Sequence, residues 1–339
     1  MRLSRLLPAG LAVSAVLMSA ACQPRAAEDA APAVAAQVAC ERPANSAAAL
    51  AAMAENEARA IAAAKASRGA GQPAMWTLKD EDTTLYILGT VHLLRPDLDW
   101  RTDEIDAAIR SADTVVFEAD TTSEQAGRDL MKFFTSQGMF TDGTQLTSLL
   151  TPEETEQLKE ALTQLNLPVE AIQPMRPWYA ALNLSVMQMT GEGFDPAAGV
   201  EMKIEAEAKA HGATFVYLET VDQQLGEFAA LDNCAQIDFL LMSAESLKQG
   251  TEVLDLLVSE WADGDAAGLG ALMSSPEAFG SEAAYAALLT NRNARWAPLI
   301  ADMLDEPGTR LIAVGAGHLV GEDSVIAMLR AEGYEVTGP

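Results

Sequence analysis

Leu85-Tyr86-Ile87-Leu88-Gly89-Thr90-Val91-His92 is an apolar, β-prone run that ends in Gly-x-x-His. The same shape returns near the other end of the chain, in Leu311-Ile312-Ala313-Val314-Gly315-Ala316-Gly317-His318. Two of the three histidines in the protein thus follow a strand-like run, stand three residues after a glycine and precede a leucine. We interpret both stretches as strand ends that deliver His92 and His318 to one site.

Two further strand-like runs end in an acidic residue. Glu118 follows residues 114–117, and Glu219 follows residues 214–218. In open α/β sheets, sites form outside the carboxyl ends of the strands, so four parallel neighbours would bring these two carboxylates to both imidazoles. Such a set suits a divalent metal, which could polarise a carbonyl and lower the pKa of a bound water. One carboxylate could remain unligated as a general base. In the alternative, the four side chains merely end structural strands.

The order of the elements predicts an α/β protein. Strands and helices alternate at both ends of residues 75–339, with a helical insert between them, which indicates a central sheet flanked by helices. The two Gly-x-x-His strand ends suggest two related halves, one starting near residue 76 and one near residue 212. The expected strands are residues 76–78, 83–88, 114–117, 214–218, 310–314 and 334–337, and the expected helices include 46–67, 103–111, 123–137, 177–189, 199–210 and 320–331, with several more in 221–306.

The first 74 residues have a different character. Residues 1–22 resemble an export signal, with a basic start and an apolar stretch that is too short for a membrane span. Small residues precede Cys22, as in bacterial lipoproteins, and cleavage by the ordinary signal peptidase is the alternative. Residues 23–45 predict a flexible tether, and 46–74 an N-terminal helix and linker. We therefore expect an exported protein, either periplasmic or anchored to the envelope through a lipidated Cys22.

Composition excludes some partners. The formal net charge is −27, from 22 Lys and Arg against 49 Asp and Glu, and so acidic a surface repels nucleic acid and anionic lipid. The chain contains no His-Glu-x-x-His, Gly-x-Ser-x-Gly or P-loop sequence. In an oxidising compartment Cys40 and Cys234 could form a disulfide, and two unpaired thiols are the alternative.

At several places along residues 75–339 the chain resembles the TraB/GumN family, which includes the Tiki proteins. The matching segments, in order, are residues 86–93, Phe117-Glu118, Arg176-Pro177-Trp178, Gly199-Val200-Glu201, Leu218-Glu219-Thr220, Asn291-Arg292-Asn293 with Trp296, and residues 314–321. The resemblance implies a fold akin to the erythromycin-esterase/ChaN group, a mixed central sheet flanked by helices. Glu201 stands where the family favours Asp, so we assign it no role.

The resemblance also carries expectations about chemistry. Tiki proteins are described as metal-dependent proteases that use Mn²⁺ or Co²⁺, and Zn²⁺ is an alternative here. By analogy His92, Glu118 and His318 are the expected metal ligands, and Glu118, Glu219 and Arg292 the expected catalytic residues. Arg292 could orient a substrate carboxylate, stabilise an oxyanion, or only form an ion pair on a helix surface.

Three functions remain open from the sequence. The first is an exported, divalent-metal-dependent hydrolase, in particular a peptidase, acting on a peptide or small-molecule substrate. The second is a ligand-binding protein of the envelope without catalysis, because the related ChaN proteins bind haem and two histidines can serve as axial ligands. The third is an interaction protein that uses the helical region 121–210.

Overall fold

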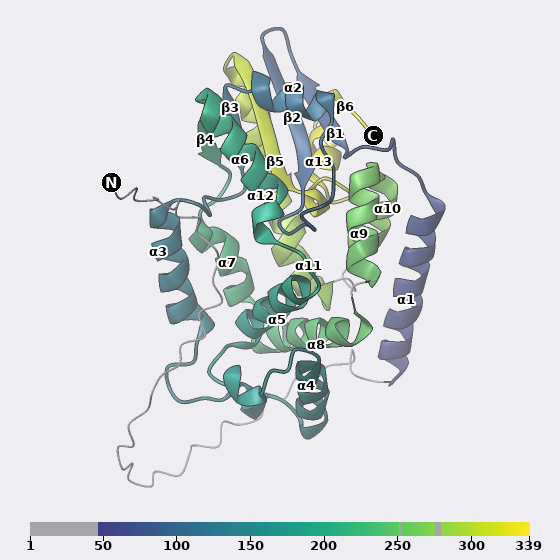
Figure 1. Cartoon of the computed structure of the whole chain (residues 1–339), viewed down its shortest axis with the longest axis vertical. Helices are drawn as coiled ribbons and strands as arrows, with labels where there is room; N and C mark the ends of the chain where they lie inside the picture. The colour runs from purple at the N-terminus through teal and green to yellow at the C-terminus, as the bar shows by residue number, and fades with distance from the viewer. Residues whose placement is uncertain (1–46, 251, 275–278) are drawn as a thin grey trace, which may run out of the picture.

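A six-stranded mixed sheet forms the centre of the protein. The structure is a computed structural model and describes residues 47–250, 252–274 and 279–339. The strand order is β4-β3-β5-β2-β1-β6. The bounds are β1 Met75–Lys79, β2 Thr83–Thr90, β3 Thr114–Phe117, β4 Thr214–Tyr217, β5 Gly308–Gly315 and β6 Val336–Thr337. The predicted α/β class with a mixed sheet is confirmed (Figure 1).

The pairing of the strands places their ends. β4, β3, β5 and β2 are parallel neighbours, whereas β1 forms an antiparallel hairpin with β2 and also pairs with β6. The central strands are buried on both faces, which suits their continuous apolar sequences; Leu85, Ile87, Leu311 and Ile312 are all 0% exposed. The carboxyl ends of the four parallel strands therefore lie along one edge of the sheet.

Helices cover both faces of the sheet. α2 (Asp103–Ser111) and α6 (Val200–His211) lie in front of it in Figure 1, and α13 (Val325–Ala331) lies behind it. α12 (Asn291–Asp302) packs against α13 and contributes Trp296 and Ile300 to the same core. The Thr102 and Ser324 side chains cap α2 and α13 by accepting from backbone N–H groups, so both helices begin where their sequences permit.

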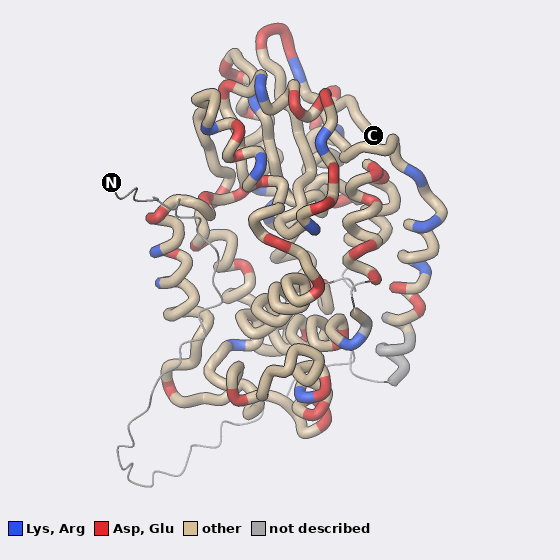
Figure 2. The backbone as a smooth tube through the Cα atoms, viewed as in Figure 1, with Lys and Arg blue, Asp and Glu red and all other residues tan. Residues whose placement is uncertain are grey.

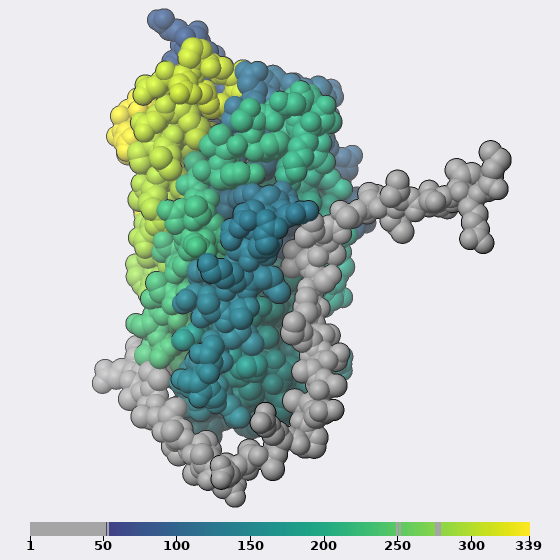
Figure 3. All heavy atoms as spheres, turned by 90° about the vertical axis from the view of Figure 1, so that its left-hand side faces the viewer, coloured from purple at the N-terminus to yellow at the C-terminus, as the bar shows by residue number. Residues whose placement is uncertain are grey.

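The helical insert has a core of its own below the sheet. It contains α3 (Glu124–Phe133), α4 (Pro152–Gln164), α5 (Pro177–Gly191), α7 (Val221–Ala230) and α8 (Asn233–Gln249). These helices pack around Trp178, which is completely buried. Figure 3 faces α3, which lies against α7.

A third group of helices flanks the sheet on the side away from α3. α1 (Ala47–Ala66) packs on α10 (Ala266–Met273), which follows α9 (Glu252–Asp263). Trp261 of α9 donates its indole N–H to the Gly89 carbonyl, 2.8 Å away, and so ties this group to β2. The short α11 (Glu282–Tyr285) precedes a π-helical turn, Ala286–Thr290, that continues into α12.

Two of the predicted helices depart clearly from their predicted bounds, whereas the others differ by at most two residues at an end. The helix expected over 320–331 begins only at Val325, because Gly321 adopts a left-handed φ of 85° and Ser324 supplies the cap. The helix expected over 123–137 is α-helical to Phe133 and then a π-helix, Phe134–Gly138. There the Thr135 hydroxyl donates to the Met131 carbonyl, an alternative partner for the helix backbone.

Several predictions about the N-terminal region stay predictions. Residues 1–22, 23–45 and Cys40 lie outside the described residues, although Cys234 in α8 is disulfide-bonded. Among the described residues, no helix is long and apolar enough to cross a membrane. Acidic residues are spread over both the sheet and the helical insert, as Figure 2 shows.

Candidate functional site at the carboxyl ends of the strands

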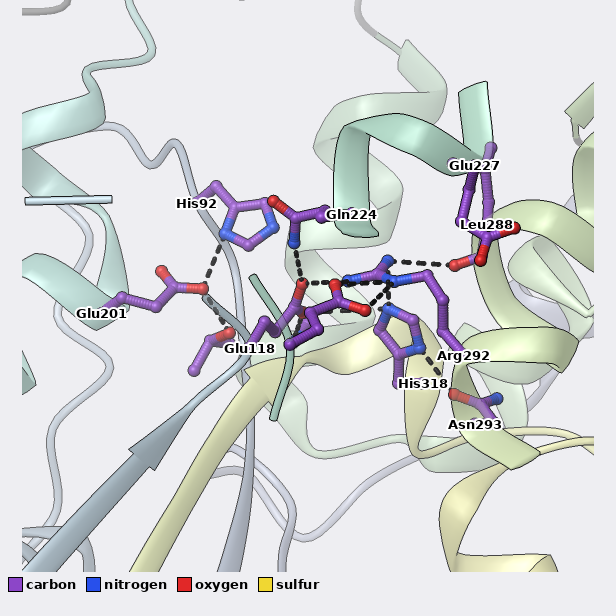
Figure 4. Close-up of polar contacts among 12 residues, drawn as sticks. His92, Glu118, Glu201, Gln224, Glu227, Leu288, Arg292, Asn293 and His318 are labelled. Carbon is purple, nitrogen blue, oxygen red and sulfur yellow. Dashed lines mark hydrogen bonds and ion pairs between the residues drawn. The ribbon is translucent and has the colours of Figure 1, made fainter. Parts of the chain in front are cut away.

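The four residues predicted from the strand ends meet at one edge of the sheet. His92 follows β2, Glu118 follows β3, Glu219 follows β4 and His318 follows β5. Figure 4 shows Glu118 between the two histidines. His318 Nε2 lies 3.8 Å from Glu118 Oε1. Glu118, Glu219 and His318 are buried, at 7%, 5% and 4% exposure, whereas the His92 side chain is 62% exposed.

Arg292 of α12 lies at the centre of this group. One terminal nitrogen of its guanidinium is 2.6 Å from Glu118 Oε2 and also 2.6 Å from Glu219 Oε1, and Nε is 3.0 Å from Glu219 Oε1. The residue is 6% exposed. The ion pair on a helix surface that the sequence left open is therefore wrong, because Arg292 is a buried cation shared by two carboxylates.

Glu118 is held at both carboxylate oxygens. Oε1 accepts from the Gly315 backbone N–H at 2.7 Å, and Oε2 accepts from Arg292 and from the Gln224 amide at 2.9 Å. Burial by itself would raise the pKa of Glu118, but the positive charge of Arg292 and the hydrogen bond from Gly315 hold it at about 2. Glu118 is therefore a carboxylate in a fixed orientation at neutral pH.

The tautomer of His318 follows from its neighbours. Arg292 can only donate, so His318 Nε2, 3.0 Å from its guanidinium, accepts with its lone pair. Nδ1 then carries the hydrogen and donates to Asn293 Oδ1 at 2.6 Å, while the Asn293 amide nitrogen donates to the Asp323 carbonyl. Burial lowers the pKa of His318 to about 3, so the ring is neutral.

His92 has a carboxylate partner of its own. Its Nδ1 lies 2.7 Å from Glu201 Oε1 in α6, and Glu201 also accepts from the Thr90 hydroxyl. The charge of Glu201 raises the pKa of His92 to about 9, although water around the exposed ring screens part of this attraction. The remaining nitrogen, Nε2, faces the region between His92 and Glu118 (Figure 4).

Sequence reasoning missed several residues of the site. The sequence does not indicate a role in the site for Asn293, Gln224 or Glu201, although each contacts one of its residues. Trp296 of α12 is completely buried, with its ring centroid 4.4 Å from that of His318 and 4.6 Å from the Arg292 guanidinium carbon. The Asn-Arg-Asn-x-x-Trp spacing places residues 292 and 296 four apart on one helix face, and that signal could have indicated the contact.

Gly315 lies beside all three expected metal ligands. A Cβ placed on this residue would lie 3.0 Å from Glu118 Oε1, 3.5 Å from His318 Cδ2 and 3.9 Å from His92 Nε2. The glycine thus keeps open a space that a methyl group would fill. Two imidazoles held at Nδ1 by oxygen partners, with Nε2 toward a carboxylate, are a donor set typical of divalent metal sites.

The donor set fits a divalent ion in kind, but its members are not gathered around one point. Within the described part of the chain, no three His, Cys, Asp or Glu side chains are arranged to hold a metal ion as they stand. The cation that Glu118 and His318 contact in this structure is the Arg292 guanidinium. An open hollow of about 550 Å³ is lined by Arg95, Phe194 and Val258 among others. Arg95 follows His92 by three residues, but His92 itself does not line the hollow.

Gly199 controls the backbone of His92. A Cβ there would lie 2.3 Å from the His92 carbonyl oxygen, so Gly199→Ala must shift either α6 or the loop that carries His92. We expect the free energy of unfolding to fall by about 1–3 kcal/mol, as for other overpacked positions. Chemical denaturation measures this.

Gly226→Ala is the control: this glycine lies within α7, and an added Cβ meets nothing within 4 Å. That variant should gain up to about 1 kcal/mol, and equal effects at both positions would contradict the expectation.

The site is a buried cluster of Glu, Arg and His side chains at the carboxyl ends of parallel strands, beside two Gly-x-x-His motifs. These features define a class of α/β proteins whose polar site is formed by the strand ends. The sequence model of the TraB/PrgY/gumN family matches residues 74–338. The chain belongs to this family, and the predicted membership is confirmed.

Two curated relatives are similar over most of their length. "Uncharacterized protein YbaP" of Escherichia coli (strain K12) is 22% identical over 248 residues, which cover 72% of this chain and 87% of YbaP. The protein of the same name from Shigella flexneri gives the same values. No solved structure matches the chain.

Proposed function

We propose that this protein is a divalent-metal-dependent hydrolase, in which His92, Glu118 and His318 hold the ion. One observation carries the proposal: each imidazole is held at Nδ1 by an oxygen, and the space left by Gly315 adjoins both rings and Glu118. Such outer partners fix the ring orientation and make the other nitrogen available as a ligand. By family analogy the ion is Mn²⁺ or Co²⁺, with Zn²⁺ as an alternative.

The residues of the chain would divide the work. The ion, when bound, would supply Lewis-acid activation of a carbonyl and a water of lowered pKa. Glu118 would contribute a permanent negative charge and His318 a neutral nitrogen, whereas His92 must release a proton before it can ligate. Arg292 would provide positive charge for an oxyanion. Its contacts favour Glu219 as the anchor of Arg292 rather than as a ligand or base.

The proposed substrate is a peptide or a small molecule with a comparable acyl bond. A substrate would approach from the side of His92, because that ring is exposed while Glu118, Glu219 and His318 are buried. The proposal includes export to the periplasm or to the envelope through a lipidated Cys22. That part rests on the sequence of residues 1–22, which lie outside the described residues.

Replacement of either ligand histidine tests the proposal. His92→Ala and His318→Ala should each lower metal affinity by more than about 100-fold, since loss of an outer partner alone costs 10–100-fold. Metal content after gel filtration and hydrolysis of a peptide library with added Mn²⁺, Co²⁺ or Zn²⁺ are the measurements. We expect about one ion per chain in the unmodified protein, following the single ligand set.

The third histidine supplies a matched control. His211 ends α6 and lies 3.3 Å from the Ala112 carbonyl, just before β4 and β3 begin, so it is at the opposite end of these strands from Glu118 and Glu219. His211→Ala should therefore retain both metal and hydrolysis. Hydrolysis that persists undiminished in a chelator, or in the His92→Ala/His318→Ala double variant, would rule the proposal out. A haem titration of the same samples tests the ligand-binding alternative. Absence of an absorbance shift would rule that alternative out.

A further inference from the structure

We propose that Arg292 competes with the metal ion for Glu118 and His318, and that Glu219 is the anchor that holds the guanidinium when the ion is bound. This inference rests on the proposed function, because it concerns the same site. It assigns Arg292 and Glu219 to the control of metal affinity, a role that neither residue type nor position in the sequence indicates.

The contacts define the competition. The Arg292 guanidinium lies 2.6 Å from Glu118 Oε2 and 3.0 Å from His318 Nε2. Those atoms belong to two of the three expected ligands. Arg292 is fixed there by four further hydrogen bonds: two to Glu219 Oε1 at 2.6 and 3.0 Å, one to Glu219 Oε2 at 3.3 Å, and one to the Leu288 carbonyl at 3.0 Å.

The chemistry of imidazole makes the two states exclusive. A neutral histidine has one lone pair on its unprotonated nitrogen. His318 donates from Nδ1 to Asn293, so the lone pair is on Nε2, where it accepts from Arg292. The same lone pair cannot accept that hydrogen bond and ligate an ion. Metal binding at His318 therefore requires the guanidinium nitrogen to leave Nε2.

Glu219 is placed to retain Arg292 after this step. Its side chain is 2% exposed and contacts Arg292 through both carboxylate oxygens. Arg295 lies 3.7 Å from Glu219 Oε2 and 2.7 Å from Glu227, so a second cation helps to fix this carboxylate. A buried cation that lost Glu118 and His318 without another partner would be costly, and Glu219 with the Leu288 carbonyl offsets that cost.

A double-variant cycle on metal affinity tests the inference. Mn²⁺ would be titrated by calorimetry into the purified protein and into the variants Arg292→Met, Glu219→Gln and Arg292→Met/Glu219→Gln, without any measurement of activity. Arg292→Met should bind at least about tenfold more tightly, because the competitor is gone. Glu219→Gln should bind about tenfold more weakly, because Arg292 then depends more on Glu118 and His318.

The double variant decides the role of Glu219. If Glu219 only anchors Arg292, its replacement has no effect once Arg292 is absent, and the double variant binds like Arg292→Met. If Glu219 is instead a metal ligand, the replacement weakens binding in both backgrounds, and the anchor role is overturned. Equal affinity in the unmodified protein and Arg292→Met would overturn the competition itself.

Arg292→Lys tests whether the contacts of Arg292 or only its positive charge affect metal affinity. It also serves as a second variant in case Arg292→Met does not fold. It keeps the positive charge but replaces the planar fork with a single ammonium, which cannot contact Glu118, Glu219 and His318 together. Tighter Mn²⁺ binding by this variant supports competition for the ligand atoms, and unchanged binding shows that only charge repulsion matters. Circular dichroism confirms that each variant is folded. If no folded variant binds Mn²⁺, Co²⁺ or Zn²⁺, the proposed function fails, which is distinct from metal binding that ignores Arg292.

Discussion

Arg292→Met is expected to lower the free energy of unfolding by about 3–5 kcal/mol, the range for removal of one partner from a buried ion pair. Glu118 and Glu219 are 7% and 5% exposed, and both would lose their closest cation. The loss is large against a total stability that is typically about 5–15 kcal/mol. Urea unfolding followed by circular dichroism, in the presence of a chelator, measures it.

Arg295 provides the comparison on the same helix. Its side chain is 41% exposed and lies 2.7 Å from Glu227, so Arg295→Met should cost no more than about 1 kcal/mol. The difference between the two variants isolates burial, because the residue type and the helix are the same. Comparable losses at both positions would show that Arg292 is not the central cation of the cluster. The lower stability of Arg292→Met is distinguishable from its changed metal affinity, because bound metal should raise the free energy of unfolding of the folded variant.

Trp296→Ala is expected to have an effect of similar size. The side chain is completely buried, and its ring lies against both His318 and Arg292. Large-to-small replacement of a buried aromatic residue costs about 3–5 kcal/mol, from lost burial and from the cavity left behind. The variant should also bind metal less tightly, because the cavity would let the His318 ring move. Thermal unfolding and metal titration together check the expectation.

Trp296→Phe is the matched control. The Trp296 indole nitrogen is buried without a hydrogen-bond partner among the described residues, so phenylalanine removes an unsatisfied donor while keeping an aromatic ring beside His318. We expect the loss of stability to be about 1 kcal/mol, well below that of alanine. A phenylalanine variant as unstable as the alanine variant would mean that the indole makes a contact essential to the site.

The strand ends of the site could be predicted from the sequence because the signal is local. An apolar run followed by Gly-x-x-His or by Glu marks where a buried strand stops, and parallel strands place their carboxyl ends at one edge. β2, β5, β3 and β4 are indeed parallel neighbours. The sequence alone therefore predicts that His92, Glu118, Glu219 and His318 are neighbours, as Figure 4 shows for three of them.

The partners of these four residues could not be found in the same way. Arg292 is 174 residues from Glu118 and 73 from Glu219, and it belongs to a helix rather than to a strand end. Its sequence context suits an exposed ion pair as well as a buried one. Glu201 likewise reaches His92 across 109 positions, from α6. Nothing in the spacing of such pairs fixes how a helix packs on a sheet.

The sequence by itself determined the α/β class, the order of the strands and helices, and the residues that end the four parallel strands, because hydrophobic periodicity and chain direction are local properties. Only the tertiary structure decided which charge sits at the centre. The packing of α12 and α6 against the sheet places Arg292 on Glu118 and Glu219 and Glu201 on His92, and the Asn293 contact fixes the tautomer of His318. Burial and the neighbouring charges together then set the protonation of each group, since the free energy of a charge depends on its surroundings in space rather than on its neighbours in the chain.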